Sequence, residues 1–491
     1  MIHRLHSVAV LGAGTMGAQI ATHLANAGIP VVLLDVTADA AAAGLKRARA
    51  LKPDPFFLPE GAALIRTGSL DDLSPLSSAD WIIEAIVEDL AVKQALVARI
   101  DEVRGRDAVV SSNTSGIPLA TIAQGRSQAF RQHWIGTHFF NPPRYLRLVE
   151  LIPTADTSSE VIGRVRHWLE QLMGKGVVTA RDTPAFIANH LGIFGVIRML
   201  EAVADGIVTI EEADAITGPA IGRPKSATFR TVDIAGLDIL TKVAADLSVR
   251  LPREEDRRAF ALPGFVPAMI ERNLLGDKTG QGFYKKMRGT EGTEIQTLDL
   301  ATMTYRAPQP PKLPELEIAR SITDTGARIR DLFLGKHKTG ELLRRTLGPT
   351  LLYAAKVAPE IAADIDDIDR AMRWGFGWDL GPFELWDAIG VEEVASTSAF
   401  GGGTFRSGEH AGSAGSKDPA SINALLKGRT KFRDGTLPAA APDLLILQAA
   451  KDRKAIVATN DGASLVDIGD GVLCVEFHSK MNAIGGDTIA M

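Results

Sequence analysis

One histidine and one glutamate, twelve residues apart, have the side chains best suited to moving a proton. His138 lies in Gly136-Thr137-His138-Phe139-Phe140, and Glu150 closes the run Leu148-Val149-Glu150. The ordinary pKa of a histidine lies near physiological pH, and a carboxylate on its second ring nitrogen would fix the tautomer and stabilise the imidazolium. The pair could therefore act as a general acid and base. The alternative is a core histidine at a strand end with a solvated glutamate nearby.

A glycine-rich turn near the N-terminus predicts a dinucleotide site. An apolar run leads into Gly12, Gly14, Met16 and Gly17, and a segment of helical periodicity follows. Gly12 permits the tight turn, Gly14 lets the backbone approach a pyrophosphate, and Gly17 allows the helix to pack closely on the strand. The next apolar run ends in Asp35, where a carboxylate would bind ribose hydroxyls and repel a 2′-phosphate. NAD is therefore favoured over NADP; a glycine turn in an ordinary α/β domain, with Asp35 as a helix cap, is the alternative.

These residues need elements that position them, and the sequence predicts a doubly wound α/β domain over residues 1–183. Apolar runs such as Trp81-Ile82-Ile83 alternate with segments of helical periodicity. Asp182-Thr183-Pro184 ends this alternation. Amphipathic segments then predict a first helical domain over residues 184–290, which would close the active-site cleft.

A second helical domain is predicted over residues 316–395, after a proline-containing linker at 291–315. Segments 228–236 and 382–390 look like copies of an internal repeat, because an aromatic residue, an aspartate and a glycine keep their offsets. Chance similarity between two short helix-turn segments is the alternative.

Several motifs in this order resemble those of the 3-hydroxyacyl-CoA dehydrogenases of fatty-acid β-oxidation, over roughly residues 5–395. They are the glycine turn, Glu84-Ala85-Ile86-Val87-Glu88 with Lys93, Ser112-Asn113-Thr114-Ser115, the His138 segment with Glu150, Asp182-Thr183-Pro184 before Asn189, and Lys278-Thr279-Gly280-Gln281-Gly282-Phe283-Tyr284. The resemblance implies a Rossmann-type NAD-binding domain followed by two all-α domains of the family's C-terminal type. It also implies NAD-dependent oxidation of (S)-3-hydroxyacyl-CoA to 3-oxoacyl-CoA.

The same resemblance implies a role for each site residue. His138 would be the catalytic base and Glu150 its partner, while Ser115 and Asn189 would hold the substrate near its reacting oxygen, since both side chains can donate and accept hydrogen bonds. The residues expected to bind the cofactor are Gly12, Gly14, Met16, Gly17, Asp35, Glu88, Lys93 and Asn141. The alternatives are a helix cap for Ser115, a polar helix face for Asn189, and solvated surface charges for Glu88 and Lys93.

An acyl-CoA substrate is anionic and needs a basic surface. Lys46, Arg47, Arg49 and Lys52, on the helix expected after the second strand, are the nearest candidates, with a solvated helix face as the alternative. The family usually has a longer helical hairpin here, whereas this chain turns at Lys52-Pro53-Asp54-Pro55. No contact with CoA is therefore assigned to a residue.

The C-terminal part of the chain is expected to contain a spacer and a partial domain. Residues 396–441 are rich in Gly, Ser, Ala and Pro, which predicts a flexible linker. Residues 442–491 resemble the opening of an enoyl-CoA hydratase domain, as in a truncated dehydrogenase-hydratase fusion. Only the first hairpin and a helix start would be present, so hydratase activity is not expected and an apolar strand edge would be exposed. An ordinary terminal hairpin is the alternative.

Composition excludes several other classes of protein. The 491 residues are enough for three or more domains, and a net charge of −5 gives no general attraction to nucleic acid. The single cysteine excludes an intrachain disulfide, and the ten histidines lack the spacing of metal ligands, so no metal is expected. The first strand is expected from about residue 7, which leaves no room for a targeting peptide, and no apolar run could span a bilayer. A soluble cytoplasmic protein without a membrane partner is expected.

Two questions stay open. Tandem helical domains would make the chain a monomeric pseudo-dimer, with a homodimer as the alternative. The function could also be NAD-dependent oxidation of a CoA-free hydroxy acid of the sugar-acid type, or non-catalytic NAD binding as a scaffold. The set His138, Glu150 and Asn189 argues against a scaffold, because a binding module needs no base at the nicotinamide.

Overall fold

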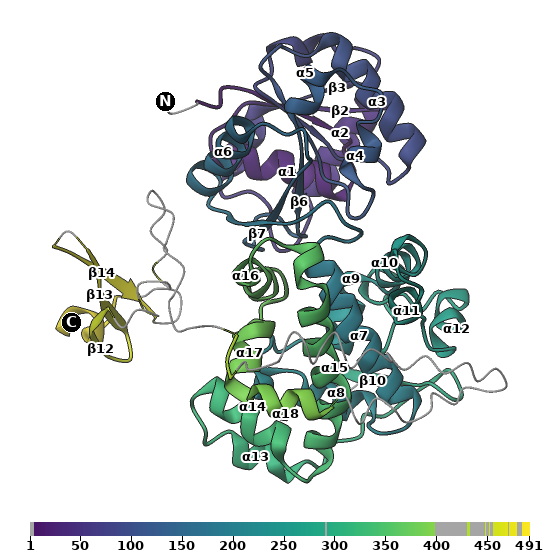
Figure 1. Cartoon of the computed structure of the whole chain (residues 1–491), viewed down its shortest axis with the longest axis vertical. Coiled ribbons are helices and arrows are strands. Elements are labelled where there is room, and N and C mark those ends of the chain that lie inside the picture. Colours follow the sequence, from purple (N-terminus) through teal and green to yellow (C-terminus); the bar gives the residue numbers. More distant parts are fainter. Residues whose placement is uncertain are drawn as a thin grey trace. The chain divides into compact units, whose positions relative to one another are not determined.

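The computed structural model describes residues 4–289, 292–397, 430–432, 447, 451, 455–469, 471–478 and 484–491. Most of the predicted linker at 396–441 lies outside the described residues. The chain forms two compact units, Met1–Phe432 and Arg433–Met491. In the first unit an α/β part is followed by two blocks of helices (Figure 1).

The α/β part contains eight strands and six α-helices. The strands are β1 (Val8–Leu11), β2 (Val31–Asp35), β3 (Ile65–Ser69), β4 (Trp81–Glu84), β5 (Val109–Ser112), β6 (Trp134–Phe139), β7 (Leu148–Pro153) and β8 (Gly176–Thr179). The helices are α1 (Thr15–Asn26), α2 (Ala38–Arg49), α3 (Leu90–Val103), α4 (Leu119–Ile122), α5 (Gln128–Gln132) and α6 (Ser159–His167). Caps explain some of these starts: Asp89 precedes α3 and its carboxylate accepts a hydrogen bond from Val92 N.

The strands form one sheet in the order β3-β2-β1-β4-β5-β6-β7-β8. β6 and β7 are antiparallel, and the other neighbours are parallel. Successive residues of β1 serve opposite faces: Val8 and Val10 pack in one apolar cluster, Ala9 and Leu11 in another. Both faces are covered, so the predicted doubly wound fold is confirmed. The order reverses between β1 and β4, and ligands of such folds bind at the carboxyl ends of strands at this point.

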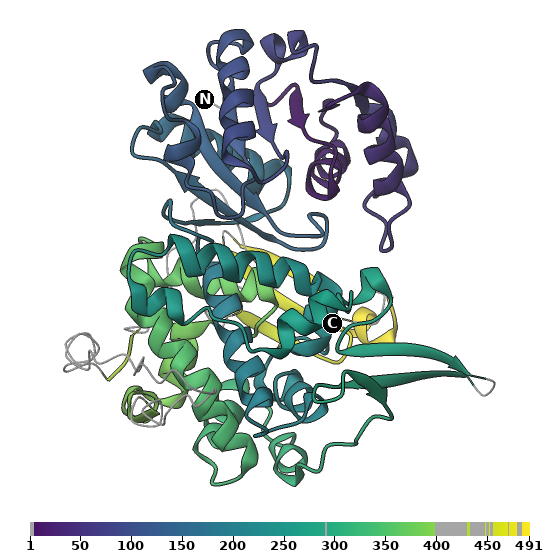
Figure 2. The same ribbon diagram turned by 90° about the vertical axis from the view of Figure 1, so that its right-hand side faces the viewer.

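The first helical block is followed by a small sheet that the sequence did not predict. Its helices are α7 (Ala188–Ala204), α8 (Ile210–Ile216), α9 (Phe229–Ala235), α10 (Leu237–Arg250), α11 (Glu254–Arg258) and α12 (Phe265–Glu271). The strands β9 (Tyr284–Gly289), β10 (Gly292–Asp299) and β11 (Thr304–Arg306) pair antiparallel in the order β11-β10-β9. Figure 2 shows β9 and β10 as a hairpin that extends beyond the helices. The segment predicted as a linker, 291–315, therefore contains two strands.

The second helical block repeats a local structure of the first. It contains α13 (Pro314–Ala319), α14 (Thr325–Leu334), α15 (Lys338–Ile361), α16 (Ile365–Phe376), α17 (Pro382–Ile389) and α18 (Val391–Ala395). α9 and α17 each end at a glycine with positive φ, 99° at Gly236 and 114° at Gly390, and the next helix begins at once. This backbone conformation favours glycine, which explains why the glycine keeps its offset in the predicted repeat.

The aspartate of the repeat also has the same role in both blocks. Asp233 Oδ1 accepts a hydrogen bond from Phe283 N at 2.9 Å, and Asp387 Oδ1 accepts one from Phe432 N at 2.7 Å. Each aspartate thereby holds a phenylalanine that comes much later in the chain. The second block includes Phe432, beyond its predicted end at residue 395.

The two blocks pack on each other through α7 and α15. Phe194 stacks on Tyr353 with ring centroids 4.1 Å apart and planes 4° apart. His190 Nε2 lies 2.7 Å from the hydroxyl oxygen of Tyr353. His190 is buried, and burial lowers its pKa to about 4. A neutral imidazole is therefore part of the core between the blocks.

His190 should make the protein less stable as the pH falls. The unfolded chain takes up a proton near the ordinary histidine pKa of 6.5, whereas folded His190 stays neutral until about pH 4. Unfolding is thus favoured by up to roughly 3 kcal/mol as the pH falls through this window. We expect His190→Gln to flatten the pH dependence of the unfolding free energy between pH 6.5 and 4, as measured by urea denaturation. If the unfolding free energy of the variant depended on pH as steeply as that of wild type, His190 would not be the group responsible.

The second unit contains an antiparallel sheet of β12 (Ile456–Thr459), β13 (Ala463–Gly469) and β14 (Val472–Phe477), and the short helix α21 (Gly486–Ala490). β13 and β14 correspond to the predicted hairpin. Apolar side chains of this sheet are exposed, among them Val457 and Leu473.

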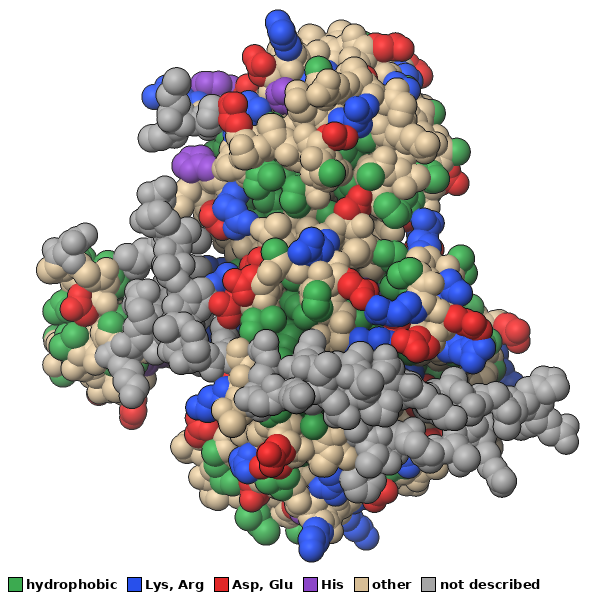
Figure 3. Space-filling model, in the orientation of Figure 1, with side chains coloured by type: hydrophobic (Ala, Val, Ile, Leu, Met, Phe, Trp, Pro, Cys, Tyr) green, Lys and Arg blue, Asp and Glu red, His purple; other side chains and the backbone are tan. Residues whose placement is uncertain are grey.

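Within the described part of the chain, no helix combines the length and apolar character needed to cross a membrane. On the face drawn in Figure 3, basic and acidic side chains of the first unit lie interspersed.

Candidate active site

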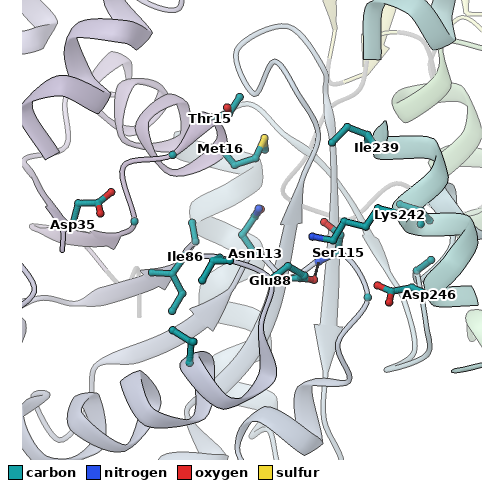
Figure 4. A pocket seen from close by; sticks show the side chains of 18 of the residues that line it. Thr15, Met16, Asp35, Ile86, Glu88, Asn113, Ser115, Ile239, Lys242 and Asp246 are labelled. Atoms are coloured by element: carbon teal, nitrogen blue, oxygen red, sulfur yellow. Dashed lines mark hydrogen bonds between the residues drawn. The ribbon is translucent and has the colours of Figure 1, made fainter. Parts of the chain in front are cut away.

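The carboxyl ends of the central strands surround a cavity of about 600 Å³. Asp35 lies at one end, the glycine turn with Met16 in the middle, and Glu88, Asn113 and Ser115 at the other end (Figure 4). The residues of the opposite wall come from α10 and are Ile239, Lys242, Val243 and Asp246. The cavity therefore occupies the position expected for a ligand of a doubly wound sheet.

The glycine turn fits a bound pyrophosphate. Gly12 has a φ of 101°, and a Cβ there would lie 2.5 Å from the carbonyl oxygen of Ala85. A Cβ on Gly17 would lie 1.9 Å from the carbonyl oxygen of Gly12. Gly14 lines the cavity and precedes α1 without a side-chain cap, so the first amides of α1 are not occupied by a capping side chain. Helix N-termini of this kind bind the phosphates of dinucleotides.

Asp35 lines the cavity and also holds the glycine turn. Its Oδ2 accepts a hydrogen bond from Ala13 N at 2.6 Å, and its Oδ1 accepts one from Val36 N at 2.7 Å. These backbone donors fix the carboxylate at the end of β2, where it would face the adenosine ribose.

The carboxylate of Asp35 should select NADH over NADPH. We expect wild type to bind NADH at least about 100-fold more tightly than NADPH, because a 2′-phosphate would meet a fixed negative charge. Asp35→Ser should reduce this preference to about tenfold or less, chiefly by weakening NADH binding. Both dissociation constants can be measured by nucleotide fluorescence. Asp39→Ser removes an exposed carboxylate from the first turn of α2 and serves as the control. If the ratio of the NADPH and NADH dissociation constants were the same in both variants, Asp35 would not select the cofactor.

Glu88 lines the cavity, whereas the structure places Lys93 beneath it. Glu88 Oε1 accepts hydrogen bonds from Ser115 N at 2.9 Å and from the hydroxyl of Thr114 at 2.6 Å. Burial raises the pKa of Glu88, but Lys93 and these donors outweigh burial, so its pKa is lowered. Lys93 is 1% exposed, and its Nζ lies 3.2 Å from Glu88 Oε2. The two residues are thus not solvated surface charges, and Lys93 contacts Glu88 rather than lining the cavity.

His138 and Glu150 face each other across the antiparallel pair β6 and β7. His138 Nδ1 lies 2.7 Å from Glu150 Oε2, and both side chains are buried. The rings of Phe140 and Phe186 flank the imidazole, with centroids 4.6 and 5.5 Å away. Because the carboxylate engages Nδ1, Nε2 is the nitrogen that can exchange a proton with a substrate. The alternative of a solvated Glu150 is wrong.

The second oxygen of Glu150 binds the start of the helical part. Oε1 accepts hydrogen bonds from Ile187 N at 3.0 Å and Ala188 N at 2.8 Å, at the N-terminus of α7. Ala185 and Phe186 have φ values of 60° and 51°, uncommon for residues with side chains, and this turn points the two amides at the carboxylate. The helix N-terminus stabilises an anion, so Glu150 can hold the imidazole and offset a positive charge on it.

The remaining predicted residues are Ser115, Asn141 and Asn189. Ser115 lines the cavity beside Glu88. Asn141 Oδ1 accepts a hydrogen bond from Gln19 on α1, at 2.9 Å. Asn189 is half-buried in the first turn of α7, directly after Ala188. Asn141, Asn189 and His138 do not line the cavity themselves.

Two parts of the site were not assigned from the sequence. Asn113 lines the cavity, and its Oδ1 accepts a hydrogen bond from Phe139 N at 2.9 Å, which joins the end of β5 to the residue after His138. Asn113 belongs to the motif Ser112-Asn113-Thr114-Ser115, so its position in the sequence already indicated a role. The wall formed by α10 had no such signal, because it depends on how the helical part packs.

Two family models match most of the described chain. Residues 7–183 match the family described as 3-hydroxyacyl-CoA dehydrogenase, NAD binding domain. Residues 186–286 and 340–429 match the family described as 3-hydroxyacyl-CoA dehydrogenase, C-terminal domain.

Individual proteins similar to this chain carry the name of the same family. A probable 3-hydroxyacyl-CoA dehydrogenase of Bacillus subtilis is 42% identical over 527 positions, which cover 100% of this chain and 64% of the relative. This chain thus spans less than two thirds of that protein. A probable 3-hydroxyacyl-CoA dehydrogenase of Deinococcus radiodurans is 44% identical over 293 residues, 58% of this chain and 84% of the relative. The crystal structure of 3-hydroxybutyryl-CoA dehydrogenase from Escherichia coli has the same fold, with a TM-score of 0.60 at 22% identity, and covers 81% of this chain and 94% of that one.

Proposed function

Because this chain belongs to the 3-hydroxyacyl-CoA dehydrogenase family, we propose that it oxidises (S)-3-hydroxyacyl-CoA to 3-oxoacyl-CoA with NAD in fatty-acid β-oxidation. The observation that carries the proposal is the buried pair of His138 and Glu150 beside a cavity that fits a dinucleotide.

The geometry suits general acid-base chemistry at a secondary alcohol. His138 Nε2 takes the hydroxyl proton as the alcohol becomes a ketone, and returns it in the reverse direction. Glu150 keeps the proton on Nδ1 and stabilises the imidazolium that forms, an interaction strongest in the transition state. When bound, NAD+ accepts the hydride that leaves the alcohol carbon.

Ser115 and Asn189 are proposed to hold the reacting oxygen. The hydroxyl of Ser115 and the amide of Asn189 can each donate to a ketone and accept from an alcohol, so both suit a group that changes between these states. Asn113, Met16, Asn141 and Glu88 are proposed to contact the cofactor, with Lys93 acting through Glu88.

One assay with the whole chain distinguishes this function from its alternatives. We expect NADH oxidation with acetoacetyl-CoA, and at least about 100-fold lower kcat/KM with acetoacetate, which lacks the CoA handle. Turnover of CoA-free acids at equal efficiency would favour the hydroxy-acid dehydrogenase. Binding of NADH without turnover of either substrate would favour a sugar-acid dehydrogenase or a scaffold.

The domain organisation supports a further part of the proposal. We propose that the boundaries near residues 183 and 290 separate the NAD-binding part from the first helical domain, and that the second helical domain takes the place of a partner subunit. The packing of α7 on α15 within one chain supports a monomeric pseudo-dimer rather than a homodimer. Sedimentation equilibrium should give the mass of one chain. A cytoplasmic location is also proposed, with which a single free cysteine is compatible.

A further inference from the structure

Beneath the cavity, two carboxylates share one ammonium. Lys93 Nζ lies 2.7 Å from Glu84 Oε1 and 3.2 Å from Glu88 Oε2. Glu84 is the last residue of β4 and is 0% exposed, and Lys93 lies in the first turn of α3 and is 1% exposed. Glu84 does not line the cavity, and the proton transfer proposed above does not use it. Burying charged groups costs desolvation free energy, which suggests that this buried cluster has a role.

Both carboxylates have the surroundings of an anion. Glu84 accepts hydrogen bonds from Lys93, from Ile86 N at 2.8 Å and from the hydroxyl of Ser112. Glu88 accepts its bonds from Lys93, Thr114 and the amide that follows Thr114, as described above. Hydrogen bonds from several donors stabilise the charged form of a carboxylate, and for Glu88 these donors and Lys93 lower the pKa. Two carboxylates and one ammonium carry a formal net charge of one negative, with Glu84 and Lys93 buried and Glu88 16% exposed at the cavity.

This charge lies at a particular end of the cavity. The adenosine of the dinucleotide is expected to bind at the end of the cavity that Asp35 lines, and the diphosphate at the glycine turn. The third part of the dinucleotide, the nicotinamide, therefore belongs at the end lined by Glu88, Asn113 and Ser115 (Figure 4). On the opposite wall, Lys242 and Asp246 line the cavity, and Asp246 Oδ1 lies 3.5 Å from Arg250 Nε.

We propose that the negative charge of Glu84, acting through Lys93 and Glu88, raises the affinity of the site for NAD+ relative to NADH. The nicotinamide ring of NAD+ carries a positive charge and that of NADH is neutral, so a fixed anion nearby attracts only the oxidised form. Glu84 is thus a positioning residue that acts through its partners. The inference rests on the proposed function only in requiring that NAD binds in this cavity.

The test is the ratio of two dissociation constants in Glu84→Gln. The amide can still accept from Lys93 and Ile86 and can donate to Ser112, so the packing is kept while the charge is lost. We expect the ratio Kd(NAD+)/Kd(NADH) to rise about three- to tenfold. Titration calorimetry gives the value for NAD+ and nucleotide fluorescence the value for NADH. Lys93→Met removes the cation instead, and should change the ratio in the opposite direction.

Two control variants distinguish the effect of the Glu84 charge from a structural effect of its side chain. Ser112→Ala removes one hydrogen bond to Glu84 without changing charge, and should leave the ratio unchanged even if both constants rise. Glu102→Gln removes an exposed carboxylate from the last turn of α3, and should leave both constants unchanged. Equal rises of both constants in Glu84→Gln would reduce Glu84 to a structural role, and an unchanged pair of constants would refute the proposal outright. If wild type bound neither nucleotide, the proposed function itself would fail.

Discussion

His138→Gln should lower kcat for acetoacetyl-CoA reduction by about 10²- to 10⁴-fold, because glutamine can form hydrogen bonds but cannot exchange a proton with the reacting oxygen. The dissociation constant of NADH should stay within about twofold, since His138 does not line the cavity. Steady-state kinetics and NADH fluorescence titration measure the two quantities on the same preparation.

The informative result is the contrast between rate and binding. A large loss of kcat with normal NADH affinity would assign the proton transfer to His138. A loss of less than about tenfold would mean that another group exchanges the proton, and our reading of the pair would be wrong. A parallel loss of NADH affinity would indicate a disturbed cavity instead.

Glu150→Gln should lower kcat for the oxidation of 3-hydroxyacyl-CoA by about 10²- to 10³-fold, although the side chain touches neither substrate nor cofactor in our proposal. The amide nitrogen of glutamine would donate to Nδ1, which favours the tautomer with the proton already on Nε2. That tautomer cannot accept a proton from an alcohol. The amides of Ile187 and Ala188 would also lose a charged acceptor, so the variant should unfold more easily, by about 1–3 kcal/mol.

The loss of rate and the loss of stability in Glu150→Gln can be measured separately by choosing the temperature. Assays well below the melting temperature count only folded protein, and thermal unfolding measures the loss of stability independently. If kcat fell only as far as the folded fraction falls, Glu150 would be a structural residue. A full loss of rate in a folded variant would support its role in orienting the imidazole.

The fold was largely predictable where the signal is local. Apolar strand runs, the glycine turn and the break at residues 182–184 predicted the doubly wound part. The repeat was visible because Gly236 and Gly390 adopt a backbone conformation that few other residues tolerate. The sheet after residue 284 was missed, since β10 and β11 carry mostly polar residues that read as a linker. Phe432 was missed because its contact with the second block comes long after the block's last helix.

The site was predictable as a set of residues but not as a set of contacts. The spacing of His138 and Glu150 suggested a pair, and the antiparallel register of β6 and β7 places them opposite each other. Motif positions cannot give the direction of a side chain, however, and Lys93 points under Glu88 rather than into the cavity. Hydrogen bonds between the sheet and α7, and the wall from α10, arise only from tertiary packing.

The two amides of α7 that Glu150 binds also bear on the order in which the protein is made. The glycine turn, Asp35 and His138 all leave the ribosome before α7 does, so a nascent or prematurely ended chain could fold its sheet and retain a dinucleotide. Its imidazole would lack a fully anchored carboxylate until α7 docked. Competence to act on a ketone or an alcohol would therefore come after the sheet has formed, and detectable turnover would report that α7 has docked on the sheet.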